Sequence, residues 1–61
     1  MTSVPELRVL AARKRQTAAL ARRTGPSLSA NADRILLLQH AEDLEAEATA
    51  LDLRAEAIEA G

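Results

Sequence analysis

The 61-residue chain contains no cysteine and a single histidine, His40. Without cysteine it can form neither a disulfide nor a thiolate metal site, and one histidine does not make a histidine cluster. A domain of fewer than about 70–80 residues usually needs such a supplement, because its core alone supplies only about 3–5 kcal/mol. We therefore expect this chain to gain stability by associating with another chain.

Phenylalanine, tyrosine and tryptophan are also absent, which removes the stacking platforms that bind single-stranded nucleic acid and the aromatic anchors of many interfaces. Apolar runs are short: the longest, residues 9–12, 18–21 and 35–38, have four residues each. A membrane-spanning helix needs about 20 apolar residues and a signal-peptide core about 7–15. We expect a soluble, cytoplasmic protein without a membrane segment.

What remains is a composition of good helix formers with clear helix boundaries. Ser3 and Glu6 fit a capping box, with Pro5 in the first helical turn, so the first helix is predicted over about residues 4–24. Gly25, followed by proline, is expected to end that helix as a left-handed cap.

A second helix is predicted over about residues 29–60, with a second N-cap offered by Ser27-Leu28-Ser29 and a turn at 25–28. So short a connection folds two helices back on each other. The predicted fold is a single all-α domain, residues 1–61: an antiparallel two-helix hairpin that associates into a homo-oligomeric bundle, most simply one of four helices.

The second helix carries a strict heptad in which large aliphatic residues alternate with alanine. This pattern indicates a coiled-coil seam with close helix approach. A further apolar stripe, which includes Leu36 and Leu53, lies on the other side of the helix, and either stripe is able to face the first helix. The seam consists of Leu37, Ala41, Leu44, Ala48, Leu51, Ala55 and Ile58.

The predicted lengths leave the end of the second helix uncovered. If the chain reverses near residues 26–28, the first helix reaches only to about residue 48, and about 18 Å of helix projects beyond it. Because that segment contains large aliphatic residues, we expect a second copy to cover it. The predicted oligomer interface comprises Leu36, Leu37, Ala41, Leu44, Ala48, Leu51, Leu53, Ala55 and Ile58.

Charge is segregated between the helices, with six basic and one acidic residue in 1–24 and eight acidic and two basic residues in 30–61. Each helix carries a row of charges seven residues apart, and such rows flank packed interfaces as ion pairs. The basic row is Arg8, Arg15 and Arg22, and the acidic row is Glu45, Asp52 and Glu59.

The basic first helix allows one alternative, a nucleic-acid-binding regulator. Its phosphate contacts would be Arg8, Arg13, Lys14, Arg15, Arg22 and Arg23. A salt-bridged face is the simpler interpretation, because the net charge of −1 and the acidic helix oppose a positive field. No nucleophile–base pair, phosphate loop or metal-ligand spacing occurs, so we expect no enzyme activity, cofactor or metal.

Residues 33–48 have the form D-R-x-x-L-L-x-x-A-E-x-L-E-x-x-A, which resembles a stretch in short, uncharacterised bacterial helical proteins. In length and alternation of small and large heptad positions, the chain is similar to the Rop family. That resemblance implies a dimeric four-helix bundle and, in the alternative, binding to paired RNA. The leading prediction is a self-associating helical adaptor or small regulatory protein, able to take up a helix of another protein.

Overall fold

A computed structural model describes residues 3–61, and its first helix, α1, spans Val4–Thr24. The Oγ atom of Ser3 accepts a hydrogen bond from the backbone N–H of Glu6, at 3.3 Å. Ser3 has the extended backbone that an N-cap requires, and a proline lies in the first turn. The predicted bounds and N-cap of the first helix are therefore confirmed.

The predicted left-handed cap at Gly25 is wrong. Gly25 has φ −50° and ψ −49°, in the right-handed helical region, and its N–H donates to the carbonyl of Ala21. The chain continues from there into a short 3₁₀ helix, η1, over Gly25–Ser27. Pro26 fits inside η1 because proline is tolerated in a first helical turn.

The second helix, α2, spans Asn31–Ala60 and begins two residues later than predicted. Its N-cap is Ala30, whose methyl side chain cannot accept a hydrogen bond, and Ser29 lies outside the helix. The axes of packed helices are about 8–10 Å apart, and three residues with an extended rise of about 3.3 Å each cover that distance. Residues 28–30 make this crossing, so Ser29 is needed for the connection.

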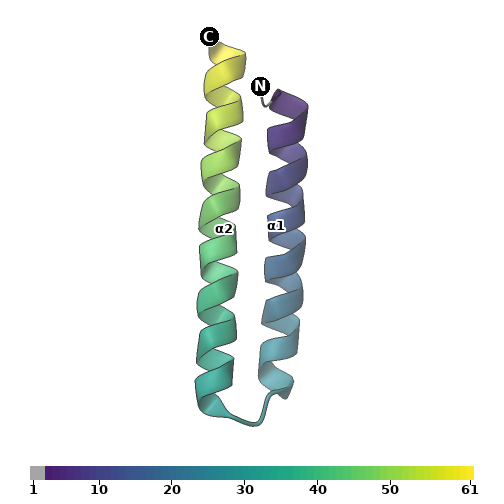
Figure 1. Ribbon diagram of the computed structural model, residues 1–61, viewed down its shortest axis with the longest axis vertical. Coiled ribbons are helices and arrows are strands. Elements are labelled where there is room, and N and C mark those ends of the chain that lie inside the picture. The colour runs from purple at the N-terminus through teal and green to yellow at the C-terminus, as the bar shows by residue number, and fades with distance from the viewer. Residues whose placement is uncertain (1–2) are drawn as a thin grey trace.

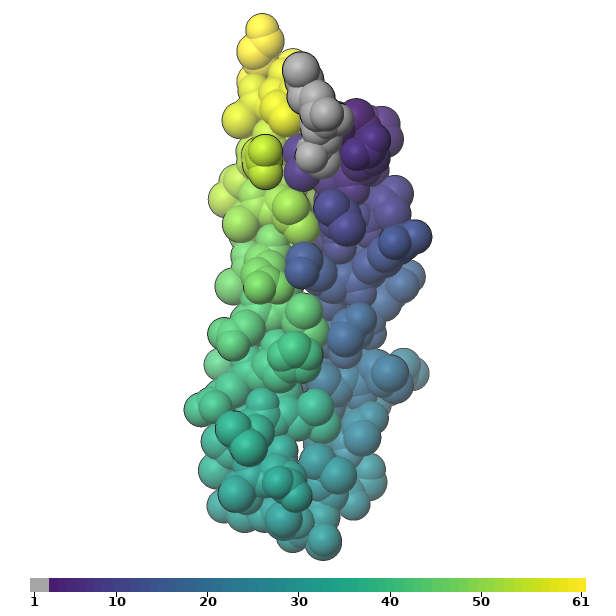
Figure 2. All heavy atoms as spheres, viewed as in Figure 1, coloured from purple at the N-terminus to yellow at the C-terminus, as the bar shows by residue number. Residues whose placement is uncertain are grey.

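The two helices pack side by side, and α2 returns along α1 so that its C-terminal end lies near the start of α1 (Figure 1). Side chains of both helices fill the space between the ribbons along the molecule, as Figure 2 shows. The molecule measures 48 × 16 × 13 Å, and residues 3–61 contain no strand. The all-helical fold class is confirmed.

The predicted overhang of α2 from residue 49 onward is wrong. Arg8, near the start of α1, pairs with Glu59, and α2 projects only slightly beyond α1 (Figure 1). The reversal occurs at residues 28–30, later than the sequence suggested, because η1 prolongs α1 at about 2.0 Å per residue. The first helix therefore reaches nearly to the end of the second.

The core between the helices is almost entirely alanine, and Leu7 is the one large side chain within residues 3–61 that is fully buried. Small residues allow the two backbones to approach closely, and this stripe of α2, not the one with Leu36 and Leu53, faces α1. The buried residues of the two helices are Leu7, Ala11, Ala18 and Ala21 of α1, with Ala41, Ala48 and Ala55 of α2.

Candidate functional site

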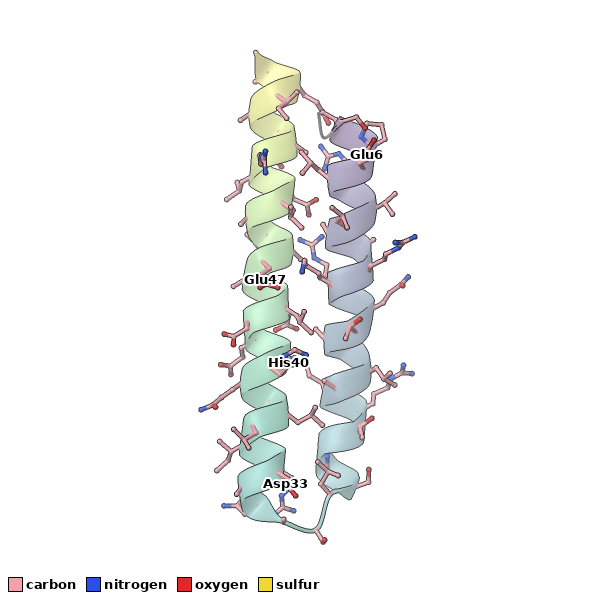
Figure 3. The ribbon with its side chains drawn as sticks, in the orientation of Figure 1. Glu6, Asp33, His40 and Glu47 are labelled. Carbon is pink, nitrogen blue, oxygen red and sulfur yellow. The ribbon has the colours of Figure 1, made fainter. Side chains whose placement is uncertain are left out.

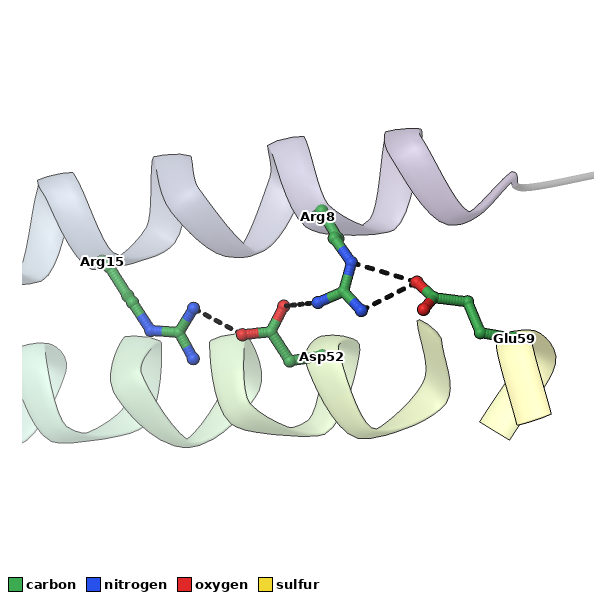
Figure 4. A network of polar contacts seen from close by, with 4 residues as sticks. All are labelled: Arg8, Arg15, Asp52 and Glu59. Atoms are coloured by element: carbon green, nitrogen blue, oxygen red, sulfur yellow. Dashed lines mark hydrogen bonds and ion pairs between the residues drawn. The ribbon is translucent and has the colours of Figure 1, made fainter. Parts of the chain in front are cut away.

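The charged rows of the two helices meet along one edge of the hairpin. The Nη2 atom of Arg8 lies 2.8 Å from Oε1 of Glu59, and its Nη1 atom lies 3.8 Å from Oδ1 of Asp52. Arg15 reaches the other oxygen of Asp52 at 2.5 Å, so four side chains form one network (Figure 4). This edge of the hairpin is closed by ion pairs.

Farther along the same edge, Arg22 binds Glu45 with two nearly parallel hydrogen bonds, Nε to Oε2 at 2.9 Å and Nη2 to Oε1. These hydrogen bonds and the opposite charge hold the pKa of the Glu45 carboxyl below its usual value. The pKa of the Arg22 guanidinium is raised for the same reason, and hydrogen bonding to Glu59 raises the pKa of Arg8. The ion-pair rows predicted from the heptad spacing are confirmed, within one chain.

These pairs weaken the basis for a nucleic-acid site. Among the predicted phosphate contacts, Arg8, Arg15 and Arg22 are bound to carboxylates, and Nζ of Lys14 lies 3.1 Å from Oε2 of Glu47. The remaining two, Arg13 and Arg23, are exposed on α1. A carboxylate beside each of four cations lowers the positive field that phosphates would meet.

The opposite edge of the hairpin, called the apolar edge below, carries a row of leucine and isoleucine beside the Lys14–Glu47 ion pair. On α2, the heptad positions that follow the buried alanines by four residues hold the acidic row, and those that follow by three hold leucine or isoleucine. The two rows therefore flank the alanine seam on opposite sides. Leu37 and Leu44 pack against the core, Leu51 is half-buried, and Ile58 is 49% exposed.

Most large aliphatic side chains of the chain are left in contact with solvent. Eight of the 14 leucines, isoleucines and valines have between 39% and 63% of their surface exposed. They occur on both helices, and α2 has the most. The exposed residues are Val9, Leu10 and Leu20 of α1, with Ile35, Leu36, Leu38, Leu53 and Ile58 of α2.

The predicted oligomer interface therefore needs correction. Ala41, Ala48 and Ala55 have no exposed surface within a single chain, so they belong to the contact between α1 and α2. Leu37, Leu44 and Leu51 keep part of their surface free at the apolar edge, together with Ile58. Leu36 and Leu53 are the most exposed aliphatic residues of α2, at 63% and 59%.

His40 is exposed on α2, and no group of three or more potential metal-ligating side chains gathers within residues 3–61. In the same described segment, neither helix combines the length and apolar character needed to cross a membrane. No match to the chain was found among family models, curated proteins or solved structures. Its function must be inferred from its own side chains.

Proposed function

We propose that this protein is a self-associating helical adaptor or small regulatory protein whose unit is an antiparallel hairpin. Copies of the hairpin join through coiled-coil-type contacts into a homo-oligomer, most simply a dimeric four-helix bundle. We propose further that the protein is not an enzyme and needs no cofactor. We also propose that it is located in the cytoplasm.

The observation that carries this proposal is the exposure of eight large aliphatic side chains in a molecule whose buried core is nearly all alanine. An alanine seam buries little apolar surface, and a small domain has little stability to spare. Covering the exposed leucines and isoleucines with a second copy would supply the missing burial. Large exposed apolar surface marks protein interaction sites.

The hairpin has apolar surface on more than one side, which suits an adaptor. The apolar edge adjoins the seam, whereas Leu36 and Leu53 lie on the face of α2 turned away from α1. Self-association at the apolar edge would leave the outer face of α2 free to bind a helix of another protein. An amphipathic helix laid in an apolar groove is a common mode of recognition.

Sedimentation equilibrium of the purified chain tests the proposal. We expect an oligomer at micromolar concentration, with a mass that is a multiple of 6.5 kDa. A helical, cooperatively folded monomer under those conditions would refute self-association. Nucleic-acid binding is the less supported alternative, because four of its six cations already have carboxylate partners.

A further inference from the structure

Two shallow grooves open on the surface of the hairpin. In each, four of the lining residues come from one helix and have the same spacing. Four residues of a groove stand at positions i, i+3, i+4 and i+7, and one further residue completes it. The α1 groove is lined by Glu6, Val9, Leu10 and Arg13, with Pro5. The α2 groove is lined by Glu47, Ala50, Leu51 and Arg54, with Lys14.

This spacing is that of the hole in knobs-into-holes packing, in which a side chain of a facing helix inserts among four residues of its neighbour. Each groove contains one leucine, Leu10 in α1 and Leu51 in α2. Leu10 is 41% exposed and Leu51 is half-buried, so each leucine is able to act as a knob as well as to line a hole.

On each helix the groove lies on the side of the alanine seam away from the row of charges, so both grooves open on one side of the hairpin, the grooved side. They also lie at the same level of the molecule. Lys14, which follows the α1 groove by one residue, pairs with Glu47 of the α2 groove at 3.1 Å. Arg8, inside the span of the α1 groove, pairs with Asp52, inside that of the α2 groove. A second hairpin related by a two-fold axis parallel to the helices would therefore bring each α1 groove against the α2 groove of the other copy.

The charges of the grooves are complementary in this arrangement. Along α1 the acid, Glu6, precedes the base, Arg13, by seven residues, and along α2 the acid, Glu47, precedes the base, Arg54, by the same interval. Because the two facing helices run in opposite directions, Glu6 comes opposite Arg54 and Arg13 opposite Glu47. Such flanking pairs set the orientation and register of packed helices.

We propose, on the basis of the self-association proposed above, that a second copy of this chain packs on the grooved side with its two-fold axis parallel to the helices. Leu10 of each copy sits in the α2 groove of the other, and Leu51 sits in the α1 groove. Glu6 and Arg13 of one copy pair with Arg54 and Glu47 of the other. Leu10 and Leu51 thereby gain the burial that one hairpin does not give them.

A two-fold axis perpendicular to the helices is the competing arrangement. Placed at the level of the grooves, it sets each groove against the same groove of the second copy, so that Glu47 meets Arg54 of the second copy and Glu6 meets Arg13. The two arrangements differ in which acid faces Arg54, because Glu6 belongs to α1 and Glu47 to α2 (Figure 3). The perpendicular arrangement, however, sets the acidic α2 against α2 and the basic α1 against α1, so that like charges accumulate along both contacts.

Charge reversal separates the two arrangements. Arg54→Glu places two acids together at both symmetry-related positions, and we expect the dimer dissociation constant from sedimentation equilibrium to rise about tenfold. The double variant Arg54→Glu with Glu6→Arg restores both pairs and should recover most of that loss. Arg23→Glu makes the same charge change on an exposed residue outside both grooves and serves as the matched control.

Each outcome decides the proposal. An unchanged dissociation constant for Arg54→Glu, or recovery by Glu47→Arg in place of Glu6→Arg, overturns the parallel two-fold axis while leaving self-association intact. A monomeric parent chain instead refutes the proposed function itself. Circular dichroism of every variant shows whether the helices are retained.

A second measurement uses the absence of cysteine from the natural chain. Arg13→Cys and Glu47→Cys, made in separate chains and mixed under oxidising conditions, should give a disulfide-linked heterodimer, whereas each variant alone should give much less. Equal linkage in the mixture and in the single variants would overturn the arrangement.

Discussion

Replacing Ala48 with leucine tests whether the alanine seam is what joins α1 to α2. Ala48 has no exposed surface, and the seam on both helices is built mainly from alanine. Leucine adds three carbon atoms at a position with no free space. Overpacking of this kind costs about 1–3 kcal/mol, because backbones or side chains must move to make room.

The matched control is Ala46→Leu on the same helix, two residues away and exposed. Alanine and leucine have nearly the same helix propensity, so the control isolates packing from helix formation. Thermal unfolding, followed by circular dichroism at one protein concentration, measures both variants. For a chain of this size, each kcal/mol corresponds to roughly 4–8 °C in Tm.

We expect Ala48→Leu to lower the Tm clearly and Ala46→Leu to leave it nearly unchanged. Equal Tm values for the two variants would show that Ala48 is not enclosed between the helices, and the register of the hairpin would have to be rebuilt. A higher Tm for Ala48→Leu would also contradict the register of the hairpin, because it would show that a leucine fits at a position that has no exposed surface.

Three further predictions follow from the two edges of the hairpin. Leu51→Ala should weaken self-association and make the Tm more dependent on protein concentration, whereas Leu53→Ala on the outer face should not change the dissociation constant in sedimentation equilibrium. Because the pKa of Glu45 is lowered in the fold, its contribution to stability is present above the unfolded pKa of about 4.3 and is lost as the pH falls through the lowered value. Glu45→Gln should accordingly reduce the acid dependence of the Tm, and an unaltered pH profile would speak against the ion pair. In mobility-shift assays at near-physiological salt, duplex DNA and structured RNA should bind weakly, and sub-micromolar binding lost on changing Arg13 and Arg23 to alanine would favour the nucleic-acid alternative.

Features that depend on neighbouring residues were predictable from the sequence. The start of α1 follows from Ser3 and the proline of the first turn, and its end from the glycine–proline pair. The heptad spacing of Arg8, Arg15 and Arg22 was enough to predict a row of ion pairs, since positions seven apart fall on one side of a helix. The sequence therefore determined two helices and the residue types on each of their sides.

The tertiary structure decided how those helices are rotated and aligned. Two stripes of α2 had comparable apolar character, and only packing showed that Ala41, Ala48 and Ala55 face α1 while Leu36 and Leu53 face solvent. The reversal point depended on η1 and on the extended residues that cross to α2, which changed the register and removed the predicted overhang. Rotation and register are fixed by contacts between residues far apart in the chain, so local propensity and periodicity leave them open. The same contacts place the ion pairs of Arg8, Arg15 and Arg22 on one edge of the hairpin, and the leucines, with the Lys14–Glu47 pair, on the other.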